Sequence, residues 1–248
     1  MDVPRACIAI PGVWTDHWFD APDAWWAWAC AWAGWTVDDW RTFRADWDRS
    51  GRAGREALMR SSGVRFLDWR QVPGGSMFGK VDAAAAVLKG HLDELPPGTD
   101  VTLIGHSKGG NVIKRYLTGL PGARHTHGMQ PAGDPELANL PLRTTSVRAV
   151  MICAPVDLVR EIACAALGFG IRPTRWPGVP DSARVATVNN WLDPSGGRLH
   201  GVRNYQVRVW NDHFIPWPPH GMKSFLARRV LTDLGAIEAR RPLPASRG

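Results

Sequence analysis

The chain has 248 residues, of which 44% are hydrophobic and 21% charged; this suits an ordinary globular protein of one large α/β domain or two small ones. The formal net charge of +7 comes almost entirely from arginines scattered along the chain, and without a basic stripe we expect no nucleic-acid partner. No apolar run is long enough to span a membrane, and residues 1–12 lack a secretory signal. We therefore expect a cytoplasmic protein, with removal of a leader from a longer precursor left open.

Short apolar runs bounded by turn residues recur along the chain, and they predict strands. These runs lie at 6–10, 64–69, 101–105, 147–154, 184–191 and 205–210. Helical spacing of apolar residues fills the gaps, at 81–95, 112–117 and 225–234. Because strands alternate with helices, we predict the α/β class: a mostly parallel sheet with helices on both faces.

Nothing in the sequence divides the chain, since it has no internal repeat and no low-complexity linker. We expect a single domain over residues 1–248. Two segments rich in Pro and Gly, 119–146 and 158–182, interrupt the alternation of strands and helices. Loops of this length are usually functional, so we predict lid-like insertions there. The four cysteines form no CxxC pair, and we expect buried thiols at Cys7, Cys30, Cys153 and Cys164.

The stretch VTLIGHSKGG, residues 101–110, places Ser107 between a predicted strand and a predicted helix. Gly105 and Gly109 flank it at the spacing Gly-x-Ser-x-Gly, and small residues there permit a tight turn that projects the hydroxyl outward. The helix that follows directs its N-terminal N–H groups at an oxyanion formed near the serine. The arrangement predicts a nucleophilic serine; the alternative is a purely structural strand–helix turn.

With this motif and the order of its elements, the sequence resembles the α/β-hydrolase superfamily, and specifically its bacterial serine esterase and lipase-like members. The resemblance implies an oxyanion hole made by two backbone amides. One belongs to Lys108, after the nucleophile, and the other to Val13 in the turn after the first strand, with Trp14 as the alternative. The usual His-Gly of that turn is Pro11-Gly12 here, a departure that does not affect the backbone amide of Val13.

The resemblance also implies the chain order serine, acid, histidine for a catalytic triad. His213 follows the last predicted strand and is the expected base, with His220 as its rival. Asp193 follows the preceding strand and is the expected acid, with Asp157 as its rival. Asp212 adjoins His213 in sequence, so their side chains are poorly placed to face each other.

The chain has 14 tryptophans, which is unusually many. Four in the segment DAWWAWACAWAGW fall at helical spacing and predict a stripe that faces the core or, alternatively, an aromatic rim for substrates: Trp25, Trp28, Trp32 and Trp35. Three others adjoin the predicted oxyanion turn, acid and base, and are expected to line a substrate pocket: Trp14, Trp191 and Trp217. His125 and His127 form an isolated HxH pair, too little to predict a metal site.

These features together predict a hydrolase of carboxylic esters that needs no cofactor or metal, and that works through an acyl-enzyme on Ser107. Its partner would be a small-molecule or lipid ester, while its oligomeric state is not predicted. Acyl transfer, thioester cleavage and amide cleavage on the same fold are the alternatives. A further alternative is a non-catalytic binding protein that retains the fold.

Overall fold

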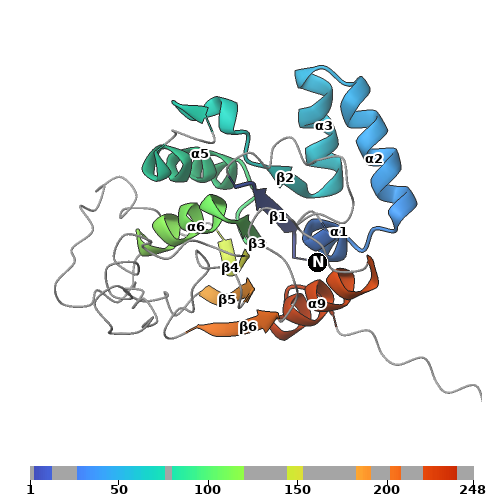
Figure 1. Ribbon diagram of the computed structural model, residues 1–248. Helices are drawn as coiled ribbons and strands as arrows, with labels where there is room; N and C mark the ends of the chain where they lie inside the picture. Colours follow the sequence, from blue (N-terminus) through green and yellow to red (C-terminus); the bar gives the residue numbers. More distant parts are fainter. Residues whose placement is uncertain are drawn as a thin grey trace, which may run out of the picture.

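The computed structural model describes residues 3–12, 27–75, 80–119, 144–152, 183–190, 202–207 and 220–238. Within these ranges the strands form one sheet in which all neighbouring pairs are parallel (Figure 1). The strands, in their order across the sheet, are β2 (Val64–Phe66), β1 (Arg5–Ile10), β3 (Thr99–His106), β4 (Thr144–Ile152), β5 (Ala183–Asn190) and β6 (Arg203–Val207). The predicted strand at each of the six positions is confirmed.

Helices cover both faces of this sheet, as in the predicted α/β class (Figure 1). They are α1 (Ala27–Ala33), α2 (Val37–Arg49), α3 (Arg52–Ser62), α5 (Val81–Asp93), α6 (Lys108–Thr118) and α9 (His220–Asp233), with the 3-10 helix η2 (Trp69–Gln71). The predicted fold class is therefore confirmed. Among these helices, none has the length and hydropathy that crossing a membrane requires.

Strand β1 shows how the two faces are made, because its side chains alternate between two buried clusters. Ile8 and Ile10 pack on one face with the buried residues of α5 and α6. Cys7 and Ala9 pack on the other face with those of α1, α2 and α9. A strand that is buried on both faces has no polar side, which is why its sequence reads as a continuous apolar run.

The tryptophan stripe belongs to the second of these clusters. Trp28 on α1 is buried in it, and Trp32 and Trp35 pack against it, while Trp25 lies outside the described residues. The indole N–H of Trp32 also donates to Thr102 Oγ1 at 3.1 Å, across to strand β3. The interpretation of the stripe as core-facing is confirmed for these three tryptophans.

Two of the cysteines can be placed in the same region. Cys7 and Cys30 are free thiols, the first buried and the second partly buried. Burial raises the pKa of the Cys7 thiol far above its usual range and raises the pKa of Cys30 to about 12. Cys153 and Cys164 lie outside the described residues.

The structure corrects the sequence-based boundaries at two places. The strand predicted at 64–69 ends at Phe66, because the Asp68 side chain accepts the backbone N–H of Arg70 and starts η2. The loop predicted at 119–146 is shorter at its end, since β4 already begins at Thr144. The insertion predicted at 158–182 and residues 120–143 of the first loop lie outside the described part of the chain.

Two helices were not predicted from the apolar spacing, α2 and α3. Only Trp40 and Phe43 are buried in α2, and no side chain of α3 is buried. Helix α2 instead begins with a capping box, in which the Thr36 hydroxyl accepts from the Asp39 N–H and Asp39 accepts from the Thr36 N–H. Helix α3 is followed by Gly63, whose φ of 68° is the left-handed value that glycine adopts freely.

Candidate active site

Ser107 lies at the carboxyl end of the central strand β3, between His106 and the first residue of α6. Its backbone has φ 51° and ψ −122°, and among the described residues it is the only non-glycine with a positive φ. Such a conformation costs about 1–3 kcal/mol for a residue with a side chain. The strained strand-to-helix turn expected of a nucleophile elbow is therefore present at Ser107.

Two backbone hydrogen bonds hold this turn. The Ser107 N–H donates to the carbonyl of Ile152 at the end of β4, with an N···O distance of 2.8 Å. The Ser107 carbonyl accepts the Gly110 N–H at 2.9 Å, which closes the first turn of α6. Ser107 is thus fixed to both the neighbouring strand and the helix, and only 6% of its surface is exposed.

The two glycines of the motif are required by close packing between three segments. A Cβ on Gly105 would lie 2.7 Å from the carbonyl carbon and oxygen of Gly109. A Cβ on Gly109 would lie 2.1 Å from the carbonyl oxygen of Ile10 in β1. Real Cβ atoms do not approach backbone atoms so closely, so α6 can dock on β3 and β1 only with glycine at both positions.

The turn after β1 lies directly against the serine. A Cβ on Gly12 would lie 2.6 Å from the Ser107 Cβ and 2.9 Å from the carbonyl oxygen of His106. The residue after Gly12 is Val13, the predicted second oxyanion donor, and both Val13 and Trp14 lie outside the described residues. The turn after β1 therefore packs directly on Ser107 through Gly12, a contact that no pattern in the sequence indicated.

Trp69 contacts both segments that carry the predicted oxyanion amides. No pattern in the sequence indicated a place for Trp69 near the site. Trp69 is buried, with only 2% of its surface exposed, and its indole N–H donates to the carbonyl of Pro11 at 2.8 Å. The ammonium of Lys108 lies 5.2 Å from the centroid of the same ring, within the range of a cation–π contact. Trp69 therefore links the turn after β1 to the first residue of α6.

Burial and a neighbouring aromatic ring act in opposite directions on the charge of Lys108. The side chain is partly buried, and this desolvation lowers the pKa of its ammonium group. The ring face of Trp69 carries a partial negative charge and favours the cation. The backbone amide of Lys108 is the predicted oxyanion donor. Lys108 is the first residue of α6, where the positive end of the helix dipole lies.

The remaining predicted site residues cannot be placed. Those that lie outside the described residues are His213, Asp193, Asp157, Trp191 and Trp217, together with His125 and His127. His220 is the first residue of α9, and its side chain is not described. Completion of a triad around Ser107 thus stays a prediction. Within the described ranges, no group of three or more His, Cys, Asp or Glu side chains is arranged to hold a metal ion.

Comparison with known proteins gives only distant structural similarities. No family model matches the chain, and no curated protein matches it. A solved structure of the pyrethroid hydrolase PytH is similar with a TM-score of 0.40 and 12% identity, covering 94% of this chain and 99% of that chain. A bifunctional GH43-CE protein of Bacteroides eggerthii is similar with a TM-score of 0.39 and 13% identity, covering 92% of this chain and 34% of that chain. At these values neither similarity indicates a function for this chain.

Proposed function

We propose that the chain is a serine hydrolase that cleaves carboxylic esters, with Ser107 as the nucleophile. The observation that carries this proposal is the strained backbone of Ser107, at φ 51° between a buried strand and a helix. A purely structural turn would be made without strain by glycine, which adopts positive φ freely. A non-glycine residue kept in such a conformation indicates that its side chain is needed there.

The proposed reaction uses the groups expected around the elbow. The Ser107 hydroxyl attacks the ester carbonyl while His213 accepts its proton and Asp193 orients the imidazole. The tetrahedral oxyanion accepts hydrogen bonds from the amides of Lys108 and Val13. When the C–O bond breaks, the alcohol leaves with the proton from His213. Water activated by the same histidine then attacks the acyl-enzyme and releases the acid.

A fluorophosphonate probe and one variant test the proposal directly. We expect the probe to label Ser107, and Ser107→Ala to lower the hydrolysis of p-nitrophenyl butyrate by about a thousandfold or more. Ser61→Ala is the matched control, because Ser61 is exposed on α3 and donates only to the Leu58 carbonyl. If Ser107→Ala retained wild-type activity, Ser107 would not be the nucleophile. No labelling and no activity would indicate a binding protein with the fold alone.

The same assays separate the rival triad members and the rival reactions. We expect His213→Gln and Asp193→Asn to abolish labelling, while His220→Gln and Asp157→Asn retain it. The opposite pattern within either pair would move the base or the acid to the rival residue. Thioester, amide and alcohol-acceptor substrates, tested on the unlabelled wild-type protein beside p-nitrophenyl butyrate, decide whether ester hydrolysis is the preferred reaction.

A further inference from the structure

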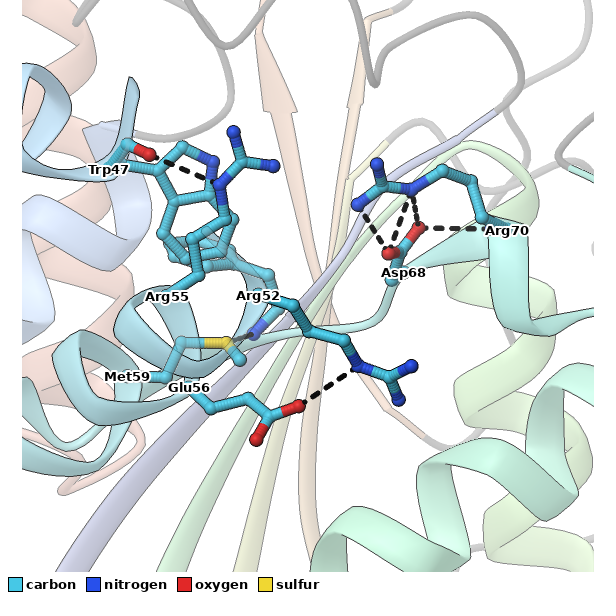
Figure 2. Close-up of polar contacts among 8 residues, drawn as sticks. Trp47, Arg52, Arg55, Glu56, Met59, Asp68 and Arg70 are labelled. Atoms are coloured by element: carbon cyan, nitrogen blue, oxygen red, sulfur yellow. Dashed lines mark hydrogen bonds and ion pairs between the residues drawn. The ribbon is translucent and has the colours of Figure 1, made fainter. Parts of the chain in front are cut away.

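A groove whose lining does not include Ser107 lies between the α2–α3 pair and the segment that follows β2. Its volume is about 930 Å³, within the range of small-molecule sites. Side chains of α2 and α3 form one wall, and residues 66–71 form the other. Figure 2 shows Arg52 and Arg55 on the α3 side and the Asp68–Arg70 pair on the other. None of these residues has a part in the proposed ester hydrolysis.

The groove combines an apolar surface with a surplus of positive charge. Its apolar lining comes from Pro11, Trp47, Met59, Phe66 and Leu67. Its charged lining in the described chain consists of four arginines and three acids, namely Arg44, Arg52, Arg55, Arg70, Asp48, Glu56 and Asp68. One guanidinium charge is therefore in excess.

Three of the four arginines are neutralised within the groove. Arg44 Nε lies 2.8 Å from Asp48 Oδ2, and Arg52 Nε lies 3.2 Å from Glu56 Oε1. Arg70 forms a two-pronged pair with Asp68, in which its Nε lies 2.8 and 2.9 Å from the two carboxylate oxygens.

The Asp68 carboxylate stays charged in this setting. Burial alone would raise the pKa of Asp68, but the hydrogen bonds from Arg70 and the nearby charges lower it on balance. These three pairs leave no net charge for a ligand.

Arg55 supplies the excess charge, and its side chain is held in place without an acid. Its Nε donates to the Trp47 carbonyl at 3.1 Å, and its guanidinium lies 5.3 Å from the centroid of the Trp47 ring. No acidic side chain in the described chain pairs with it, so its terminal amino groups are directed at no carboxylate there. A guanidinium fixed through Nε and a ring face presents its two terminal NH2 groups, and one N–H from each can donate to the two oxygens of a carboxylate.

We propose that this groove binds a small apolar molecule that carries one carboxylate, and that the Arg55 guanidinium binds this carboxylate. The single excess charge fits a monoanion better than a phosphate dianion. The apolar wall of Trp47, Met59 and Leu67 contacts the body of the ligand. Binding does not depend on reaction at Ser107, so it is tested without any activity assay.

Titration calorimetry at low salt with benzoate, hexanoate and 4-phenylbutyrate tests the site on the full chain. We expect at least one of these carboxylates to bind saturably, and Arg55→Gln to weaken it by about tenfold or more, as expected for loss of a charge-assisted hydrogen bond. Arg41→Gln is the matched control, since Arg41 also lies on the α2–α3 pair but is paired with Asp38 at 3.0 Å outside the groove. It should bind as the wild type does.

Three further measurements can refute the proposal. Benzamide, the neutral counterpart of benzoate, should not bind, and inorganic phosphate should not displace the carboxylate. Arg55→Lys keeps the charge over Trp47 but lacks the two NH2 groups, so we expect an intermediate affinity, which also serves if Arg55→Gln folds poorly. Three results would each overturn the proposal. They are equal carboxylate affinity in the wild type and both Arg55 variants, no saturable binding of benzoate, hexanoate or 4-phenylbutyrate, and phosphate binding as tight as that of the carboxylate.

Discussion

The docking of α6 on the sheet can be tested by one substitution whose usual effect is reversed at this site. Exchanging glycine for alanine inside a helix normally stabilises a protein by about 0.5–1 kcal/mol. Gly90 in α5 should follow this rule, because an added Cβ there meets no atom within 4 Å. Gly109 in α6 should not, because its Cβ would lie 2.1 Å from the Ile10 carbonyl oxygen and 2.8 Å from the carbonyl carbon.

The size of the effect follows from what the new methyl group meets. The clashing atoms belong to the backbone of β1, which is hydrogen-bonded to β2 and β3 on its two sides and cannot rotate away as a side chain would. Overpacking of this kind costs about 1–3 kcal/mol and outweighs the gain in helix propensity. We therefore expect Gly109→Ala to lower the free energy of unfolding by about 1–3 kcal/mol, and Gly90→Ala to raise it by about 0.5–1 kcal/mol.

Urea unfolding followed by far-UV circular dichroism measures both variants under the same conditions. Opposite shifts of the unfolding midpoint, with unchanged slopes, are the expected result. If Gly109→Ala were as stable as Gly90→Ala, α6 could not lie against β1 as described. The reason given for the second glycine of the motif would then be wrong.

Two further predictions follow from single contacts. Trp69→Phe keeps an aromatic ring, although a smaller one, and removes the N–H that the Pro11 carbonyl accepts. We expect kcat for p-nitrophenyl butyrate to fall by about tenfold with little change in KM; an unchanged kcat would show that Trp69 does not position the turn after β1 for the reaction. Burial lowers the pKa of His91 below its usual 6.5, so the stability that its neutral form contributes is present above about pH 6.5 and is lost as the pH falls through the lower folded value. His91→Gln should therefore make the urea midpoint less sensitive to a change from pH 7.5 to pH 5, and an unchanged pH dependence would contradict this account.

The sequence predicted the parts of the fold that depend on burial along a single element. In β1 the five residues after Arg5 are buried, so an apolar run of matching length marks the strand. In α6 the buried Val112, Ile113, Tyr116 and Leu117 recur at helical spacing. The position of Ser107 was predictable because the Gly-x-Ser-x-Gly motif, residues 105–109, falls between the apolar run that ends at 105 and the helical spacing that begins at 112.

The α2–α3 pair was not predictable from such patterns. Its helices bury few side chains, and their exposed faces carry ion pairs within each helix, such as Arg41 with Asp38 and Arg52 with Glu56. Their polarity indicated a solvated surface, which is correct for most of these residues. Part of this polar surface lines a groove, because in the folded chain the two helices lie opposite residues 66–71.

Contacts between distant segments explain how the chain tolerates a strained serine. Such contacts cannot be predicted from the periodicity of apolar residues along the sequence. The Ser107 turn is held by the Ile152 carbonyl from one side and by the first turn of α6 from the other. Gly12 lies against Ser107 as a third contact, at a distance that leaves no room for a methyl group. Because three separate elements fix the turn, relaxing Ser107 would require several of these contacts to break together. A conformation that costs about 1–3 kcal/mol alone can therefore persist in the folded protein.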